Sequence, residues 1–219
     1  MLVSPGGSIL GTIGGGAVEE RIIEEAQAVI QSGKPVKIYY RLEEDLGMQC
    51  GGNVEVYIEP LGICQKLYIF GAGHVGKALA GLAHRFGFEI TFLDFRSIQF
   101  SEEEKKIARF IEGDYFETLK TLEYDQETYI TIMSPTHEHD FELLKQLGKK
   151  TFAYLGMIGS KRKVAKAKEE LLVGGYFTKE EFTRFDTPMG LPMAAETPEE
   201  IAISILGKII DVRNKKLNP

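Results

Sequence analysis

One stretch, residues 66–76 (Lys-Leu-Tyr-Ile-Phe-Gly-Ala-Gly-His-Val-Gly), constrains the fold of this chain more than any other. A short apolar run ends at a glycine turn, and apolar residues then recur at three- and four-residue spacings as far as Phe86. Gly87 closes that helix, and a second apolar run ends at Asp94. A strand, a glycine turn, a helix, a strand and an acid form the context in which G-x-G-x-x-G predicts a Rossmann unit.

Each residue of this motif has an expected task. Gly71 allows the tight turn, Gly73 lets the phosphates of a ligand approach the backbone, and Gly76 lets the helix pack close to the strand. The N-terminus of the helix that follows the turn offers free N–H groups to an anion, and Asp94 stands where an acid would meet a ribose hydroxyl. The alternative is a Rossmann-shaped fold that binds no dinucleotide, because fold does not fix function.

Composition excludes several classes of protein. The chain has 219 residues, a net charge of -6 and a pI of about 5.4, which argues against a general nucleic-acid surface. Hydrophobic residues make up 43% of the chain, enough for a core, but no apolar run is long enough to span a bilayer. The N-terminus lacks a signal-peptide pattern. The two cysteines do not make a disulfide framework, so a reducing, cytoplasmic setting is expected.

The residues before the Rossmann unit predict a smaller α/β domain. A helix is expected from about Ala17 to Ser32, because it carries one apolar stripe, and strands are expected at residues 36–42 and 54–60. We place the boundary near Gly62. The prediction is a small N-terminal domain, residues 1–62, followed by a doubly wound parallel sheet, residues 63–219.

Two glycine-rich loops in the small domain invite a functional interpretation. Gly14-Gly15-Gly16 precedes a helix whose first turn carries Glu19 and Glu20, which would repel an anion, so a tight turn is favoured. Cys50 is followed by two glycines in a second loop, where nearby N–H groups could stabilise its thiolate. A buried, inert cysteine is the alternative. Cys50 is therefore a candidate for catalysis or for metal contact.

A polar cluster follows the β-rich run of residues 128–133. His137, His139 and Asp140 stand directly after it, at the sheet edge that Gly73 and His74 should share. The cluster could supply acid–base groups or, with His74, metal ligands. The alternative is that these side chains hydrogen-bond the loop and cap a helix over residues 141–147. We favour contact with a ligand over a metal site.

A second anion site is expected after the strand of residues 151–156. Ser160 is a plausible N-cap, and Lys161, Arg162 and Lys163 place three cations in the first helical turn. Cations there oppose the helix dipole, so a bound anion would explain them. A solvated basic surface is the alternative.

Taken together, these motifs resemble the xanthine dehydrogenase accessory factor family, the XdhC/CoxI-like proteins. The matching pieces, in order, are residues 11–19, Cys50-Gly51-Gly52, residues 69–76, 136–140 and 155–163, Gly190-Leu191 and residues 195–202. The resemblance spans nearly the whole chain. It departs at Ala17, where many members carry a cysteine, and at Pro192-Met193-Ala194, where the family usually has Asp-Ile-Gly. Relatives usually have a further strand and helix before the segment that matches Met1, so a short variant or a domain completed by another subunit is expected.

The resemblance implies a chaperone of the molybdenum cofactor (molybdopterin) and a maturation factor more than a turnover enzyme. Such a protein would bind the cofactor transiently, support its sulfuration and pass it to a xanthine dehydrogenase-type hydroxylase, with a cysteine desulfurase as a second partner and a homodimer as the expected oligomer. Gly73, Ser160, Lys161 and Arg162 would form the anion pocket, and Cys50 would contact molybdenum or sulfur. The rival hypotheses are an NAD(P)-dependent oxidoreductase, with His137 as a proton donor, and a nucleotide-sensing module.

Overall fold

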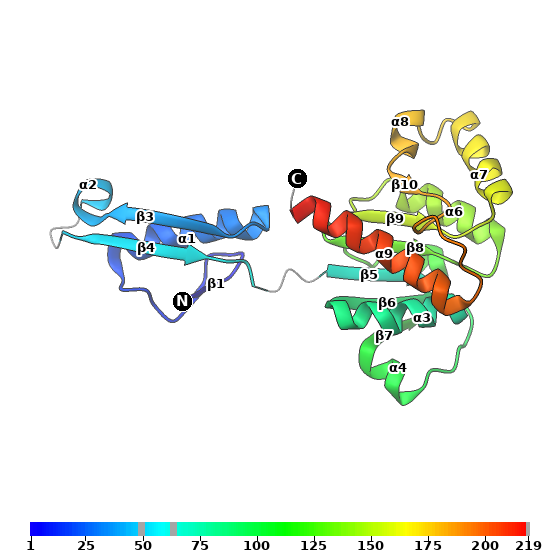
Figure 1. Cartoon of the computed structure of the whole chain (residues 1–219), viewed down its shortest axis with the longest axis horizontal. Helices are drawn as coiled ribbons and strands as arrows, with labels where there is room; N and C mark the ends of the chain where they lie inside the picture. The colour runs from blue at the N-terminus through cyan, green and yellow to red at the C-terminus, as the bar shows by residue number, and fades with distance from the viewer. Residues whose placement is uncertain (48–50, 62–64, 218–219) are drawn as a thin grey trace. The chain divides into compact units, whose positions relative to one another are not determined.

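The computed structural model describes residues 1–47, 51–61 and 65–217 (Figure 1). The chain divides into two compact units, Met1–Ile63 and Cys64–Pro219, and each is described by itself. Among the described residues, no helix combines the length and the apolar character needed to cross a bilayer.

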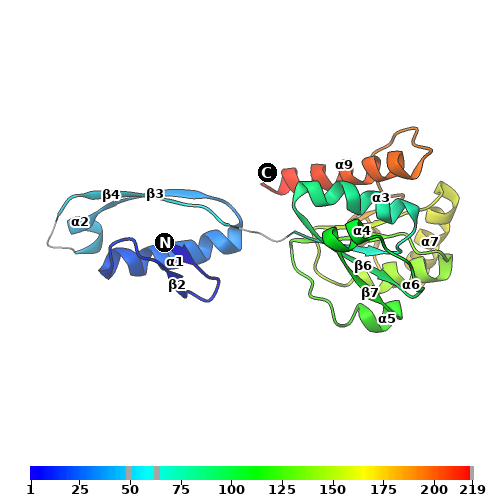
Figure 2. The same ribbon diagram turned by 90° about the horizontal axis from the view of Figure 1, so that it is seen from below.

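The first unit is a helix packed on a two-stranded antiparallel hairpin (Figure 2). Its elements are β1 (Leu2–Val3), β2 (Ile9–Leu10), α1 (Gly16–Ser32), β3 (Val36–Arg41), α2 (Leu42–Leu46) and β4 (Asn53–Ile58). Val18 and Ile22 of α1 pack against Tyr40 and Val56 of the hairpin in a small core. The helix and both strands agree with the sequence prediction, and β1 and β2 pair as a further short antiparallel hairpin.

The second unit is a six-stranded, wholly parallel sheet with helices on both faces. The strands are β5 (Gln65–Phe70), β6 (Phe88–Asp94), β7 (Ala108–Glu112), β8 (Thr128–Ile132), β9 (Tyr154–Met157) and β10 (Phe185–Asp186). The helices are α3 (His74–Ala83), α4 (Glu102–Ile107), α5 (Tyr115–Thr118), α6 (His137–Leu147), α7 (Lys161–Val173), α8 (Lys179–Phe182) and α9 (Pro198–Leu217). The strand order β7-β6-β5-β8-β9-β10 is that of a doubly wound Rossmann fold, so the predicted fold class is confirmed.

Side chains alternate along β5, so the sheet has a hydrophobic core on each of its two faces. Tyr68 and Phe70 face a core shared with α5, α6 and α7, while Leu67 and Ile69 face a second core shared with α3 and α9. All four side chains are buried because both faces carry helices. The order of the strands reverses between β5 and β8, and ligands of such sheets bind beyond the carboxyl ends of the strands at that point.

The structure differs from the sequence prediction in the length of some elements. β9 begins at Tyr154 rather than at Thr151. The short strand β10, which pairs with β9, was not predicted. Two residues carry too little periodicity to indicate a strand, so this element depends on its neighbour in the sheet.

Candidate functional site

The three glycines of the turn between β5 and α3 have different roles. Gly71 has φ +114°, and a Cβ atom there would lie 2.3 Å from the carbonyl oxygen of Met133. A Cβ atom at Gly76 would lie 2.4 Å from the carbonyl oxygen of Gly71. Gly73 has φ −76°, and a Cβ atom there would meet nothing within 4 Å. A side chain at Gly71 or Gly76 would therefore clash with neighbouring backbone, so these two positions require glycine. Gly73 instead leaves open space at the N-terminus of α3.

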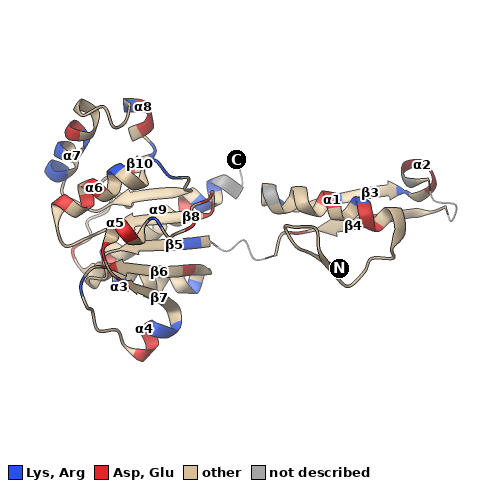
Figure 3. Ribbon diagram, turned by 180° about the vertical axis from the view of Figure 1, so that it is seen from behind, with Lys and Arg blue, Asp and Glu red and all other residues tan. Residues whose placement is uncertain are grey.

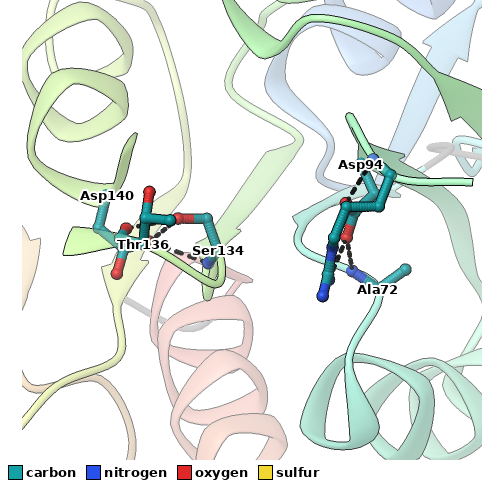
Figure 4. A network of polar contacts seen from close by, with 6 residues as sticks. Ala72, Asp94, Ser134, Thr136 and Asp140 are labelled. Carbon is teal, nitrogen blue, oxygen red and sulfur yellow. Dashed lines mark hydrogen bonds and ion pairs between the residues drawn. The ribbon is translucent and has the colours of Figure 1, made fainter. Parts of the chain in front are cut away.

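Asp94, at the end of β6, binds the glycine turn and a neighbouring arginine (Figure 4). Its Oδ2 accepts the Ala72 N–H at 2.9 Å and Arg96 Nη2 at 2.8 Å. Its Oδ1 accepts the Arg96 N–H at 3.0 Å and Arg96 Nε at 2.9 Å. A carboxylate has about four acceptor positions, so Asp94 as it stands is saturated. A ribose hydroxyl could bind Asp94 only by displacing Arg96.

The pKa of Asp94 reflects this environment. Burial alone would raise the pKa, but the hydrogen bonds from Arg96 and Ala72 outweigh burial and lower the pKa below its ordinary value. A carboxylate whose pKa is lower in the folded protein stabilises the fold above its unfolded pKa and loses that effect as the pH falls through the folded pKa.

We therefore expect the stability advantage of the wild type over Asp94→Asn to depend on pH. It should be roughly 1.5–3 kcal/mol at pH 7, the range for hydrogen bonds to a charged group. It should stay constant down to about pH 5 and shrink below about pH 4, where an ordinary aspartate becomes protonated. Urea titrations of both proteins at a series of pH values measure this difference, and a constant gap down to pH 3 would contradict the ion pair.

The polar cluster after β8 lies in the first turn of α6, because Thr136 rather than a later residue caps this helix. The sequence prediction started the helix at residue 141, which was wrong by one turn. Asp140 is fully buried, and its Oδ1 accepts the N–H of Ser134 at 2.9 Å and the hydroxyl of Ser134 at 2.6 Å (Figure 4). Its Oδ2 accepts Nζ of Lys163 at 2.5 Å. Asp140 thus joins the loop after β8 to the start of α7.

The three histidines at this edge of the sheet, His74, His137 and His139, differ in their surroundings. His137 and His74 are exposed, and His139 is half-buried among aromatic rings. The expectation that His137 and His74 share one edge of the sheet is confirmed, because β5 and β8 are adjacent and parallel. Within residues 1–47, 51–61 and 65–217, no group of three His, Cys, Asp or Glu side chains could hold a metal ion.

A groove of about 860 Å³ lies between α6 and α7. Its lining includes His137, Phe141, Met157, Ser160, Arg162, Lys163 and Lys166, together with the acidic residues Glu138, Glu142 and Glu170. The Ser160 hydroxyl accepts the Lys163 N–H at 3.2 Å, which confirms the predicted N-cap of α7. Figure 3 shows the basic residues that gather on α7 and the acidic residues on the neighbouring α6.

The groove partly matches the predicted anion pocket. Ser160 and Arg162 line it, whereas Lys161 is exposed and is absent from its lining. Lys163, the third cation expected at this site, lines the groove, and so does Lys166, which the sequence had not indicated. Helical spacing could have indicated Lys166, since it stands four residues after Arg162 on the same face. Cys50, the remaining candidate, lies outside the described residues.

A second, smaller cavity of about 240 Å³ lies at the ends of β6 and β7. Phe92, Phe100 and Phe110 give it aromatic walls, and Asp94 and Arg96 stand at the side of the glycine turn. The rings of Phe92 and Phe110 are stacked with centroids 5.3 Å apart. No sequence motif indicates this cavity, because its aromatic residues come from separate segments.

Comparison with known proteins agrees with this architecture. The model of the XdhC Rossmann domain matches residues 67–209, and the model of the XdhC and CoxI family matches residues 1–41. The Escherichia coli (strain K12) protein YqeB, itself uncharacterised, is 35% identical over 98% of this chain. A Bacillus subtilis (strain 168) protein, a probable component of xanthine dehydrogenase, is 28% identical over 74% of this chain. The chain spans 40% and 47% of the lengths of these two relatives.

A solved structure shows the same fold. The crystal structure of a xanthine dehydrogenase from Bacillus halodurans superimposes with a TM-score of 0.60 and 20% identity, covering 94% of this chain and 83% of the other. The match of the Rossmann-domain model extends from β5 into α9, and thus includes the glycine turn, Asp140 and the start of α7. On these grounds the chain belongs to the XdhC family.

Proposed function

We propose that this protein is an accessory factor that binds the molybdenum cofactor, supports its sulfuration and inserts it into a xanthine dehydrogenase-type hydroxylase. One observation carries the proposal. The open face of Gly73 at the N-terminus of α3 and the groove at the start of α7, to which Arg162 and Lys166 contribute cations, both lie at the carboxyl edge of a single sheet. Membership of the XdhC family supports it, as does the B. subtilis relative.

The residues present fit the organic part of this cofactor. Molybdopterin carries a planar pterin and a phosphate, and a helix N-terminus with open space in front suits a phosphate. Arg162 at the groove adds a cation, and about 860 Å³ lies within the usual range for a small-molecule site. The described residues supply no three-ligand metal group. The contacts proposed are therefore to the pterin and the phosphate, and the cofactor itself would supply the molybdenum and its sulfur chemistry.

The proposed role requires partner proteins and a reducing compartment. A xanthine dehydrogenase-type enzyme would receive the cofactor, a cysteine desulfurase would supply the sulfur, and the protein would act as a homodimer without turning over a substrate. Cys50 is proposed as the residue that contacts molybdenum or sulfur. A cytoplasmic setting would keep both cysteines reduced.

An anaerobic titration of the purified protein with the molybdenum cofactor, with and without excess NAD, tests the proposal. We expect tight binding that NAD does not displace. Failure of the cofactor to bind, together with clear binding of NAD, would reject the accessory role in favour of a nucleotide-dependent one.

Gly73→Val gives a sharper version of this test. The backbone at Gly73 suits any residue, and the new side chain would point into open space, so the variant should fold. Its side chain would stand where a phosphate approaches the start of α3, so binding should weaken at least tenfold. Gly81→Ala, at an exposed position of the same helix, is the control and should bind normally. Unchanged affinity in a folded Gly73→Val protein would remove the glycine turn from the site.

A second candidate function is nucleotide binding, for a dehydrogenase or a sensing module. The aromatic cavity beside Asp94 and Arg96 favours it, because this end of a Rossmann sheet is where a nucleoside binds. Binding of a ribose would have to open the Asp94–Arg96 pair. NADH fluorescence measures this directly: a shift or quenching at micromolar protein supports the second function, and an unchanged spectrum counts against it.

A further inference from the structure

Two buried polar atoms near the switch point have no hydrogen-bond partner in the described part of the chain. They are the hydroxyl oxygen Oη of Tyr115 and Nδ1 of His139. Tyr115 is 1% exposed, so its hydroxyl is also shielded from water. Leaving such a group unpaired is unfavourable, and unpaired groups of this kind are uncommon in folded proteins.

Both residues lie where β5 and β8 adjoin. Tyr115 opens α5, and its ring centroid is 5.9 Å from that of Phe70, the last residue of β5. His139 lies in the first turn of α6, directly after β8. The centroids of the Tyr115 and His139 rings are 5.6 Å apart, with the rings edge to face. The two unpaired atoms thus belong to one aromatic cluster at the carboxyl edge of the sheet.

The charges of Asp94 and Asp140, which belong to the two polar networks of Figure 4, both act on Tyr115. Burial raises the pKa of Tyr115 far above its ordinary value, and the charges of Asp94 and Asp140 raise it further, while Arg96 lowers it. Tyr115 therefore stays a neutral O–H group that can donate one hydrogen bond and accept others.

Phe95 packs against both members of this pair. Its ring lies edge to face with both partners, with centroids 5.6 Å from Tyr115 and 5.0 Å from His139. Phe95 itself is 41% exposed, and it stands at the start of a segment, residues 95–101, without regular secondary structure. A rotation of this one side chain toward solvent would free the surface of Tyr115 and His139 that Phe95 now contacts, without disturbing a helix or a strand.

We infer that Tyr115 and His139 form a subsite for the amide edge of a planar heterocycle, which enters in place of the Phe95 ring. The Tyr115 hydroxyl would donate to the carbonyl oxygen, and Nδ1 of a neutral His139 would accept from the amide N–H. The aromatic cluster would stack against the flat ring. Both the lactam of a pterin and the carboxamide of nicotinamide present this edge. The inference rests on the proposed function only for the choice between these two sources.

Tyr115→Phe separates this role from a structural one. The variant keeps the buried ring and removes only the unpaired hydroxyl, so the melting temperature of the ligand-free protein should stay the same or rise. The affinity of the full-length protein for the molybdenum cofactor, measured in the anaerobic titration, should fall at least fivefold. His139→Phe, which keeps an aromatic ring and removes Nδ1, should lower the affinity in the same way.

Tyr129→Phe is a matched control. Tyr129 is also fully buried with an unpaired hydroxyl, but it stands near the start of β8, away from the carboxyl edge. Its replacement should likewise leave the melting temperature unchanged or higher, and it should leave the affinity unchanged.

The same titrations are run with NAD, so that the fate of the subsite and that of the proposed function can be told apart. If the wild type binds the cofactor and Tyr115→Phe binds it equally well, the subsite is overturned and the accessory role stands. If the wild type binds only NAD and Tyr115→Phe weakens that binding, the subsite stands with nicotinamide as its ligand. If the wild type binds neither ligand, both proposals are rejected.

Discussion

Replacing Asp140 with alanine should lower the free energy of unfolding of the Rossmann unit by about 3–5 kcal/mol. Asp140 is fully buried and accepts hydrogen bonds from Ser134 and Lys163. Its removal would leave the Lys163 ammonium group, whose side chain is only 17% exposed, without its partner. The Ser134 N–H would lose its acceptor as well. Breaking one half of a buried ion pair is costly for this reason, even where the intact pair adds little. Urea denaturation at pH 7 measures the effect.

The same helix offers a control for this substitution. Glu142 forms an ion pair with Lys145 one turn away, but both side chains are more exposed, at 33% and 24%. Glu142→Ala should therefore cost less than about 1 kcal/mol. If Asp140→Ala cost no more than Glu142→Ala, Lys163 would have to reach water freely, and Asp140 would not be the link between the loop after β8 and α7.

Replacing Gly71 with alanine should have an effect of similar size, at least about 3 kcal/mol, because two penalties combine. The backbone at Gly71 has φ +114°, which side-chain-bearing residues rarely adopt. The new Cβ atom would also lie 2.3 Å from the carbonyl oxygen of Met133 and 2.7 Å from its carbonyl carbon. Both clashes are with backbone, so the ends of β5 and β8 would have to separate. The midpoint of urea unfolding should fall accordingly.

Two other glycines close to this turn provide the comparison. Gly81→Ala, at an open and exposed position inside α3, should raise stability by up to about 1 kcal/mol, because alanine is the better helix former. Gly73→Ala should change stability by less than about 1 kcal/mol, since its Cβ atom meets nothing. If Gly71→Ala and Gly73→Ala lost equal stability, any side chain in the turn would be destabilising, and the contact with Met133 would not be the cause.

The features that the sequence predicted correctly depend on short-range interactions. The N-cap of α7 was predicted at Ser160 and is confirmed by its hydrogen bond from the Lys163 N–H. Three other caps likewise join residues three apart: Ser101 with Glu104, Thr178 with Glu181, and Thr197 with Glu200. A cap needs only a side chain and a backbone group in the same turn. The Rossmann unit was predicted for the same reason: the glycine turn, its helix and both flanking strands are contiguous in the chain.

The start of α6 shows where local patterns fail. Thr136 carries no capping acid three residues later but His139, so the sequence did not mark the helix start. The Thr136 hydroxyl nevertheless accepts the His139 N–H at 3.4 Å, and the buried Asp140 holds the first turn against α7. A tertiary contact therefore decided the boundary that the pattern left open.

By itself, the sequence determined the Rossmann unit, the doubly wound sheet and the edge that His137 and Gly73 share, because apolar periodicity and glycine turns act over a few residues. Only the tertiary structure decided that Asp94 is saturated by Arg96, that Lys163 rather than Lys161 turns inward, and that Tyr115 and His139 come together without hydrogen-bond partners. Asp140 and Lys163 are 23 residues apart and stand on separate helices. Parallel pairing of β8 with β9 brings the starts of those helices together, and no spacing within the chain encodes that distance.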